Sequence, residues 1–147
     1  MQEALIEIEK KYNGLVVVKK LAFPLSEITF RATEAVLCVK NFDQRKNMSS
    51  LIYKNQGRWR NDRYPESLWK SYAKKSGADL FEWEKCLKEK ESSARINKSR
   101  DLGLGLGVRA TPTFFVGETK MEGSKSIDRL KGVIEGNVLK LKKREGR

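Results

Sequence analysis

The sequence predicts an α/β fold in which a block of helices separates a first strand from a C-terminal strand pair and a final helix. A β-branched run with little alternation covers residues 15–22, which is typical of a strand buried on both faces of a sheet. Apolar residues at helical spacing then dominate from about residue 26 to residue 106. A second β-like run at residues 113–116, with a turn after it, returns the chain to the sheet.

The segment before the first strand is predicted to be a helix. Residues 2–13 place Leu5, Ile8 and Tyr12 three and four residues apart, the stripe of a helix that lies on a core. Gly14 follows, and a glycine at this place is typical of a helix end.

The helical block is expected to hold about four helices. Ser26 fits the N-cap of the first helix, and Asp79 caps a later helix with Glu82 three residues on. The polar segment 55–64 is expected to be a loop. The predicted helices cover residues 26–42, a segment around 48–52, and residues 65–77, 79–87 and 93–104.

The C-terminal part is expected to form a hairpin and one helix. The run Thr113–Val116 is followed by a turn at Gly117–Glu118, and residues 120–122 can return as the second strand. Residues 126–134 then place apolar side chains on one side of a helix. These side chains are Ile127, Leu130, Val133 and Ile134.

Length and composition predict one domain. A chain of 147 residues with 39% hydrophobic residues can bury a core, and we expect a domain at residues 1–135 and a basic flexible tail at residues 136–147. No apolar run approaches the roughly 18 residues that span a bilayer. The N-terminus is charged and amphipathic, so we expect neither a membrane span nor a signal peptide in this sequence.

The charge balance is basic, with 31 Lys and Arg against 19 Asp and Glu. A net charge of +12 can favour nucleic acid or an anionic membrane surface, but the cations are spread along the chain and mixed with glutamates. Aromatic residues among the lysines suggest a single-strand platform, yet helical spacing explains Trp69, Tyr72, Phe81 and Trp83 as packing. We therefore favour a solvated basic surface over a nucleic-acid site.

Several kinds of catalytic and metal site are excluded by composition. The sequence has no histidine, which removes Ser-His-Asp and Cys-His catalysis and the commonest zinc ligands. Its two cysteines, Cys38 and Cys86, do not form a Cys-x-x-Cys pair. The alternating glycines Gly103, Gly105 and Gly107 end a predicted helix instead of opening one, so they do not match a dinucleotide loop. No metal and no cofactor are predicted.

Three stretches carry a resemblance to a known family, over about residues 5–135. They are GVRATPTFFVGETKMEG at Gly107–Gly123, FPLSEITFRATEAVLCV at Phe23–Val39 and DLFEWEKCL at Asp79–Leu87. Together they resemble the DsbA-like disulfide oxidoreductases. The resemblance implies a thioredoxin-like fold with an all-helical insertion at about residues 26–106.

The resemblance also implies the roles of particular residues. Pro112 would follow a cis peptide bond, and Thr111 before it would offer its backbone to an extended polypeptide substrate. Cys38 and Cys86 would pair as a structural disulfide within the insertion, with two reduced buried thiols as the alternative. The family is mostly extracytoplasmic, so a periplasmic or cell-envelope location is implied.

One departure from the family pattern is expected to matter most. The family's catalytic Cys-x-x-Cys and the strand before it precede the helix that begins here at about Gln2, and neither occurs in this sequence. The sheet is then N-terminally truncated, with unpaired edges at residues 16–18 and 113–116. More N-terminal sequence, direct pairing of the two strands, a swapped segment, or a homodimer or other partner strand would fill the gap.

Three functions follow from these observations. The first is a DsbA-like thiol-disulfide oxidoreductase domain, inactive as given because the cysteine pair is absent. The second is a non-catalytic thioredoxin-like module that binds extended peptides. The third, less favoured, is a basic protein that interacts with nucleic acid. The kappa-class glutathione transferases share the fold, but their distinguishing residues are not recognisable here.

Overall fold

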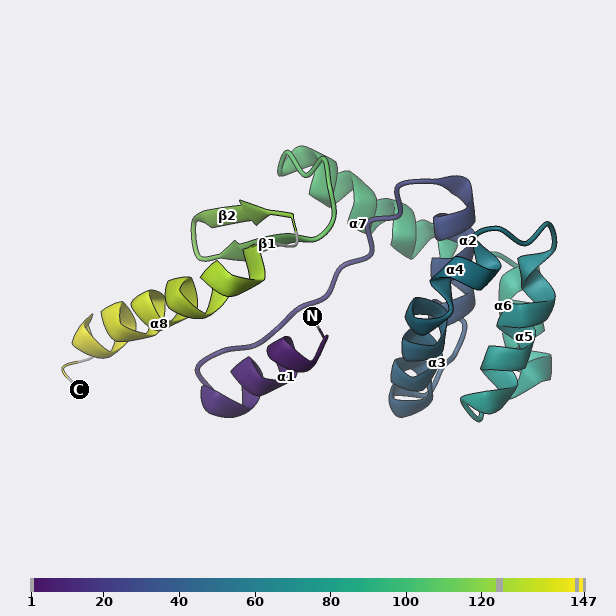
Figure 1. Cartoon of the computed structure of the whole chain (residues 1–147), viewed down its shortest axis with the longest axis horizontal. Coiled ribbons are helices and arrows are strands. Elements are labelled where there is room, and N and C mark those ends of the chain that lie inside the picture. Colours follow the sequence, from purple (N-terminus) through teal and green to yellow (C-terminus); the bar gives the residue numbers. More distant parts are fainter. Residues whose placement is uncertain (1, 124–125, 145, 147) are drawn as a thin grey trace. The chain divides into compact units, whose positions relative to one another are not determined.

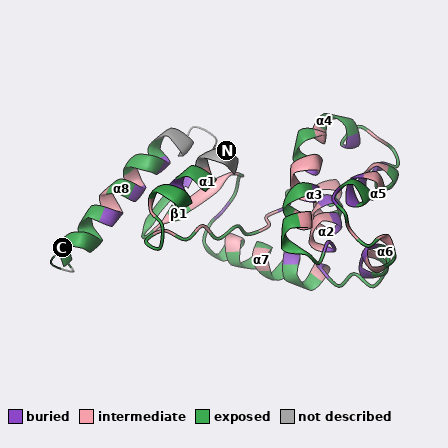
Figure 2. Ribbon diagram, turned by 90° about the horizontal axis from the view of Figure 1, so that it is seen from below, coloured by how far each residue is buried: buried purple, intermediate pink, exposed green. Residues whose placement is uncertain are grey.

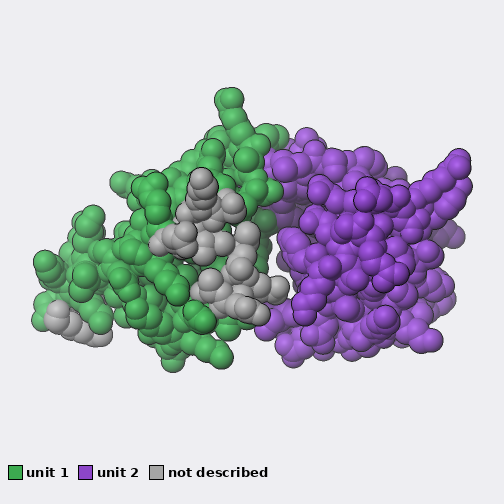
Figure 3. Space-filling view, viewed as in Figure 1, with its two compact units in different colours: residues 1–21, 104–147 green, residues 22–103 purple. Residues whose placement is uncertain are grey.

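The computed structural model describes residues 2–123, 126–144 and 146, and it divides the chain into two compact units. Unit 1 joins Met1–Leu21 to Leu104–Arg147, and unit 2 is the intervening Ala22–Gly103 (Figure 3). Unit 2 is thus inserted into unit 1 along the sequence. Among the described helices, none combines the length and the apolar character that a bilayer crossing requires.

Unit 2 is made of helices that are set by local capping (Figure 1). They are α2 (Glu27–Leu37), α3 (Phe42–Lys54), α4 (Gln56–Trp59), α5 (Pro65–Lys75), α6 (Leu80–Lys88) and α7 (Ser93–Gly105), whose last residues belong to unit 1. The Asn41 side chain accepts hydrogen bonds from two main-chain amides at the start of α3. Asp79 Oδ1 accepts one from Glu82 N, 3.0 Å away, at the start of α6. These contacts satisfy amides that a helix start leaves unpaired.

The core of unit 2 is built around three tryptophans. Figure 2 colours the buried residues of its helices purple. The rings of Trp59 and Trp69 meet edge to face with centroids 5.8 Å apart. Trp83 is also buried, and its Nε1 donates to the main-chain oxygen of Ala35, 2.8 Å away, which joins α6 to α2. Phe81 differs from the predicted packing, since its side chain is exposed. Burial of such large rings is the main contribution to the stability of a small helical unit.

The described residues of unit 1 form two helices and a hairpin (Figure 1). Its elements are α1 (Gln2–Lys11), β1 (Thr113–Val116), β2 (Thr119–Glu122) and α8 (Ser126–Arg144). The strands are antiparallel, with Thr113 opposite Glu122 and Val116 opposite Thr119. Gly117 takes the left-handed conformation that the tight turn needs, with φ of 56°. The core of unit 1 consists of Ile8, Met121, Leu130, Ile134 and Val138.

The strand predicted at residues 15–22 is not formed, so this expectation was wrong. The segment is irregular, and the sheet in the described residues consists of β1 and β2 alone. Val16 packs against the core of unit 1, but the side chain of Val17 is 75% exposed, so the run is not buried on both faces. The main-chain amide of Val18 donates to Glu9 Oε1, 3.1 Å away. A β-branched run becomes a strand only when a neighbouring strand takes up its main-chain hydrogen bonds.

Two further segments differ from expectation. The final helix was expected to stop near Ile134, with a flexible tail at residues 136–147, but α8 continues to Arg144. Burial of Val138 one turn after Ile134 accounts for the extension. Part of the predicted loop at residues 55–64 is the short helix α4, which carries the buried Trp59. The side chain of Ile127, predicted for the apolar face, lies outside the described residues.

Candidate functional site

The loop ahead of β1 carries the two predicted substrate-binding residues, Thr111 and Pro112. The peptide bond between them is cis. Thr111 is exposed and Pro112 is half-buried. The described hydrogen bonds include none that uses the main chain of Thr111, so its N–H and C=O can reach a ligand. An extended peptide is recognised through such free main-chain groups.

Three hydrogen bonds hold this loop in place. Lys120 Nζ on β2 donates to the main-chain oxygen of Gly107 at 2.5 Å. Thr113 Oγ1 donates to the oxygen of Ala110 at 2.7 Å, and the amide of Gly123 donates to the oxygen of Pro112 at 2.8 Å. The loop is thereby fixed to the hairpin at both ends and in its middle. Thr111 and Pro112 stay the substrate-binding residues predicted from sequence. Lys120 was not predicted, because its role depends on a contact thirteen residues away.

An open strand edge lies next to the loop. β1 pairs with β2 on one side, and within the described residues no strand pairs with its other side. Phe114 and Val116 of β1 and Val16 of the irregular segment pack against the same core of unit 1. The open edge of β1 presents main-chain donors and acceptors that can bind an extended segment.

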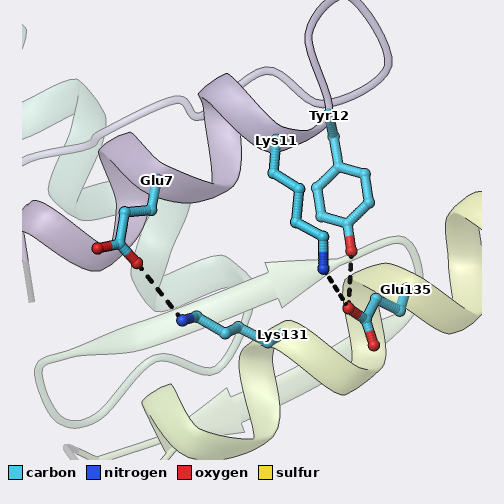
Figure 4. A network of polar contacts seen from close by, with 5 residues as sticks. All are labelled: Glu7, Lys11, Tyr12, Lys131 and Glu135. Carbon is cyan, nitrogen blue, oxygen red and sulfur yellow. Dashed lines mark hydrogen bonds and ion pairs between the residues drawn. The ribbon is translucent and has the colours of Figure 1, made fainter.

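A polar network joins α1 to α8 in the same unit (Figure 4). Glu135 Oε1 accepts hydrogen bonds from Lys11 Nζ at 2.7 Å and from Tyr12 Oη at 3.0 Å. Glu7 and Lys131 form a second pair, at 3.5 Å. The hydrogen bond from Lys11 holds the pKa of Glu135 below its ordinary value, and the same bond raises the pKa of Lys11.

The network was not predicted, although the sequence carries a signal for it. Each helix has a charged pair four residues apart, Glu7 with Lys11 and Lys131 with Glu135, in opposite order of sign. A shallow hollow of about 180 Å³ lies beside these residues, lined by the α1 residues Glu7, Ile8, Lys11 and Tyr12 and by Lys131. The charged groups are exposed and already paired with one another, so this arrangement orients α1 against α8.

The two cysteines lie together in unit 2, away from the loop in sequence. Cys38 at the end of α2 and Cys86 on α6 form a disulfide with Sγ atoms 1.98 Å apart. Both are buried, and Ser92 Oγ is 3.2 Å from Cys38 Sγ. Neither residue is an exposed thiolate, the species that attacks a substrate disulfide.

The comparison with protein families identifies the class of this protein. A family model described as thioredoxin matches residues 1–136, which includes α1, the helical unit, the loop at Thr111 and Pro112, and most of α8. The chain therefore belongs to the thioredoxin family. No curated protein and no solved structure matches the chain.

Proposed function

We propose that this chain is the substrate-binding body of a DsbA-like thiol-disulfide oxidoreductase. An extended peptide binds at Thr111 and Pro112, and a Cys-x-x-Cys pair that these 147 residues do not contain performs the exchange. A thiolate of the reduced substrate attacks the catalytic disulfide and forms a mixed disulfide, releasing one catalytic thiolate. The second substrate thiolate then attacks the substrate sulfur of the mixed disulfide, which forms the substrate disulfide and releases the other catalytic thiolate. The substrate loses two electrons and two protons, and the catalytic pair gains them.

The observation that carries the proposal is the family match together with the loop it covers. The match extends over Thr111 and Pro112, and in the structure this loop is anchored while the main chain of Thr111 is left free. The open edge of β1 beside the loop supports the proposal, because it can pair with the strand that carries the cysteines or with a strand from a second copy.

The location belongs to the same proposal. A disulfide oxidant works where disulfides persist, and a buried disulfide in unit 2 is in keeping with such a compartment. We therefore propose that the protein acts outside the cytoplasm, in the periplasm or the cell envelope.

The first experiment reads the DNA in frame ahead of the Met1 codon and expresses the longer chain. We expect it to encode a strand followed by Cys-x-x-Cys, and the longer chain to oxidise a reduced dithiol peptide. With the second catalytic cysteine replaced by alanine, the remaining thiolate should attack a disulfide-bonded peptide and release one peptide thiolate, and the mixed disulfide that no second cysteine resolves should be detected by mass spectrometry. A longer chain without a cysteine pair, or with a pair that oxidises nothing, would refute the enzymatic role.

The second experiment tests the peptide site in the 147-residue chain. Binding of a fluorescent extended peptide without cysteines is measured for Thr111→Pro, which removes the main-chain N–H, and for Thr111→Ala, which keeps it. We expect weaker binding for Thr111→Pro alone, with both variants showing the unfolding midpoint of the native chain. Peptide binding with no redox activity in any longer chain would identify a non-catalytic binding module, the second function predicted from sequence.

A further inference from the structure

The segment Tyr53–Tyr64 of unit 2, here called the basic–aromatic turn, is rich in exposed cations. It runs from the end of α3 through α4 to the start of α5, and Figure 2 shows α4 at one end of the unit. Its basic residues are Lys54, Arg58, Arg60 and Arg63, all of them exposed. Asp62 is the acidic residue of the segment, and its Oδ1 accepts a hydrogen bond from the amide of Tyr64 at 2.8 Å.

The turn is a fixed surface, because its central residue belongs to the core. The side chain of Trp59 is 2% exposed, and its Nε1 donates to the oxygen of Ile52, 2.8 Å away. Its ring also packs against Trp69 of α5. Arg58 and Arg60, on either side of Trp59, therefore project from a backbone that is fixed to the core of unit 2.

These cations are concentrated in sequence, since four of them lie between residues 54 and 63 beside one acidic residue, and the ion pairs of the described residues leave them unneutralised. None of the four takes part in an ion pair with any described residue, whereas three other cations of unit 2 each pair with a glutamate. The three pairs are Arg31–Glu66, Lys40–Glu82 and Lys70–Glu84. A concentration of unpaired cations attracts an anionic surface, and three of the four are arginines, whose guanidinium groups match phosphate oxygens.

Two exposed tyrosines flank the cations. The side chains of Tyr53 and Tyr64 are 70% and 66% exposed, although large rings usually find cover in a folded unit. The guanidinium carbon of Arg63 lies 5.6 Å from the ring centroid of Tyr64 and occupies one face of that ring. Tyrosine has an apolar ring and a polar hydroxyl, which suits the boundary between lipid headgroups and acyl chains.

We propose that the basic–aromatic turn docks on an anionic phospholipid surface. The phosphates bind the four cations, and Tyr53 and Tyr64 enter the headgroup region. Single-stranded nucleic acid offers the same phosphates, but it is bound in grooves where bases stack on open aromatic faces. Arg63 already covers one face of the Tyr64 ring, so a base cannot stack there. The basic–aromatic turn also lies at one end of unit 2, which favours a flat membrane surface over a single-stranded nucleic acid.

The proposal is tested by sedimentation of the 147-residue chain with vesicles of equal parts phosphatidylglycerol and phosphatidylcholine, and with pure phosphatidylcholine vesicles as the neutral reference. We expect binding to the anionic vesicles alone, decreasing as salt rises. Each cation close to an anionic bilayer contributes about fivefold to partitioning, so Lys54→Gln, Arg58→Gln and Arg60→Gln together should weaken binding about a hundredfold.

A matched control removes the same charges from elsewhere on unit 2. Lys88, Arg95 and Arg100 are exposed, and their replacement by glutamine gives the same net charge as the first variant. We expect this control to bind nearly as well as the native chain. Equal losses in the two variants would show that net charge acts without a defined surface, and would overturn the proposal.

The tyrosines and the competing ligand complete the test. Tyr53→Ser should weaken vesicle binding several-fold and leave the salt dependence unchanged, because it removes a ring and no charge. A fluorescent oligothymidylate is titrated with the same proteins. Tight oligonucleotide binding that the cation variant abolishes, in the absence of vesicle binding, would assign the turn to nucleic acid instead of lipid.

Discussion

Lys11 Nζ lies 2.7 Å from Glu135 Oε1 and so connects α1 to α8 across 124 residues of sequence. The pKa of Glu135 is lowered by this hydrogen bond, and the carboxylate contributes stability as long as it is ionised. This contribution is complete above the ordinary carboxyl pKa and is lost as pH falls through the lowered pKa of the folded state. The raised pKa of Lys11 also reflects a stabilising contribution to the folded state. That contribution is present below the ordinary lysine pKa and is lost as pH rises through the raised pKa of the folded state.

We expect Glu135→Gln to lower the free energy of unfolding at pH 7 by a small amount, because both side chains are exposed and water screens the pair. The difference in stability between the native chain and the variant should shrink as pH falls below the ordinary carboxyl pKa and through the lowered pKa of Glu135. Urea unfolding at pH 7, 5 and 3 measures this convergence. A difference that persists unchanged at pH 3 would show that the ion pair does not cause it.

Much of the fold follows from local sequence patterns. The apolar spacing of Leu5, Ile8 and Tyr12 predicts α1, and Asp79 with Glu82 marks the start of α6, as the structure shows. Helices depend on hydrogen bonds between residues close in sequence, so periodicity and caps predict them well. The run at residues 15–22 has a clear β propensity, but a strand also needs a neighbouring strand to pair with, and the propensity of the run does not show whether one is present.

The site is less accessible to sequence reasoning. Thr111 and Pro112 were predicted as site residues through the resemblance of their surroundings to a family, since a Thr-Pro pair alone indicates no function. The anchoring of their loop by Lys120 and the pairing of Lys11 with Glu135 join residues far apart in sequence, and only the folded chain brings them together. Charge signs four residues apart suggest that two helices can pair but do not show which helices will meet.

The disulfide is expected to be the largest single covalent contribution to the stability of unit 2. Cys38 and Cys86 are 48 residues apart. In the chain-entropy account, a disulfide that closes such a loop raises the free energy of the unfolded state by about 4 kcal/mol, because it removes conformational entropy from the unfolded chain. Cys38→Ala with Cys86→Ala should therefore lower the free energy of unfolding by about that amount. Urea unfolding of the native chain with and without dithiothreitol provides the comparison, and non-reducing mass spectrometry establishes the bond. Equal stability of oxidised and reduced chains would contradict a structural role.

Gly103 and Gly105 in α7 should respond differently to the same substitution. A Cβ at Gly103 would lie 2.7 Å from Phe23 Cδ2, whereas a Cβ at Gly105 meets nothing within 4 Å. Alanine in a helix interior is favoured over glycine by about 0.5–1 kcal/mol, so Gly105→Ala, at the last residue of α7, should stabilise the chain by part of that amount. At Gly103 the displacement of the ring outweighs that gain, and we expect a net loss of about 1 kcal/mol. Thermal unfolding of both variants measures the difference, and equal shifts would exclude the contact.

Tyr72 places a buried hydroxyl in the core of unit 2 without a described hydrogen-bond partner. A buried polar group that lacks a partner costs about 1–3 kcal/mol of desolvation. Tyr72→Phe removes the hydroxyl and keeps the ring, so we expect it to raise the free energy of unfolding by about 1 kcal/mol. Tyr53→Phe, at an exposed position, serves as the control and should change little. A loss of stability in Tyr72→Phe would indicate that a water molecule satisfies the hydroxyl.

Lys120 should decide how firmly the loop at Thr111 and Pro112, the proposed peptide site, is held. Its ammonium group lies 2.5 Å from the oxygen of Gly107 and 2.7 Å from Glu122 Oε1, so it ties the start of the loop to β2. Lys120→Met keeps most of the aliphatic side chain but removes the hydrogen bond. Loss of a hydrogen bond costs about 1 kcal/mol, which raises the equilibrium constant for local opening of the loop about fivefold. Hydrogen–deuterium exchange of the amides at residues 108–111 should accelerate by that factor.

The same variant should bind an extended peptide more weakly, because a loosened loop must be ordered again when the peptide binds. Lys142→Met, at an exposed position on α8, is the matched control, and it should alter neither the exchange rates nor the peptide affinity. Faster exchange with unchanged peptide affinity would place the peptide elsewhere than at Thr111. Unchanged exchange would show instead that the hydrogen bonds of Thr113 and Gly123 hold the loop without Lys120.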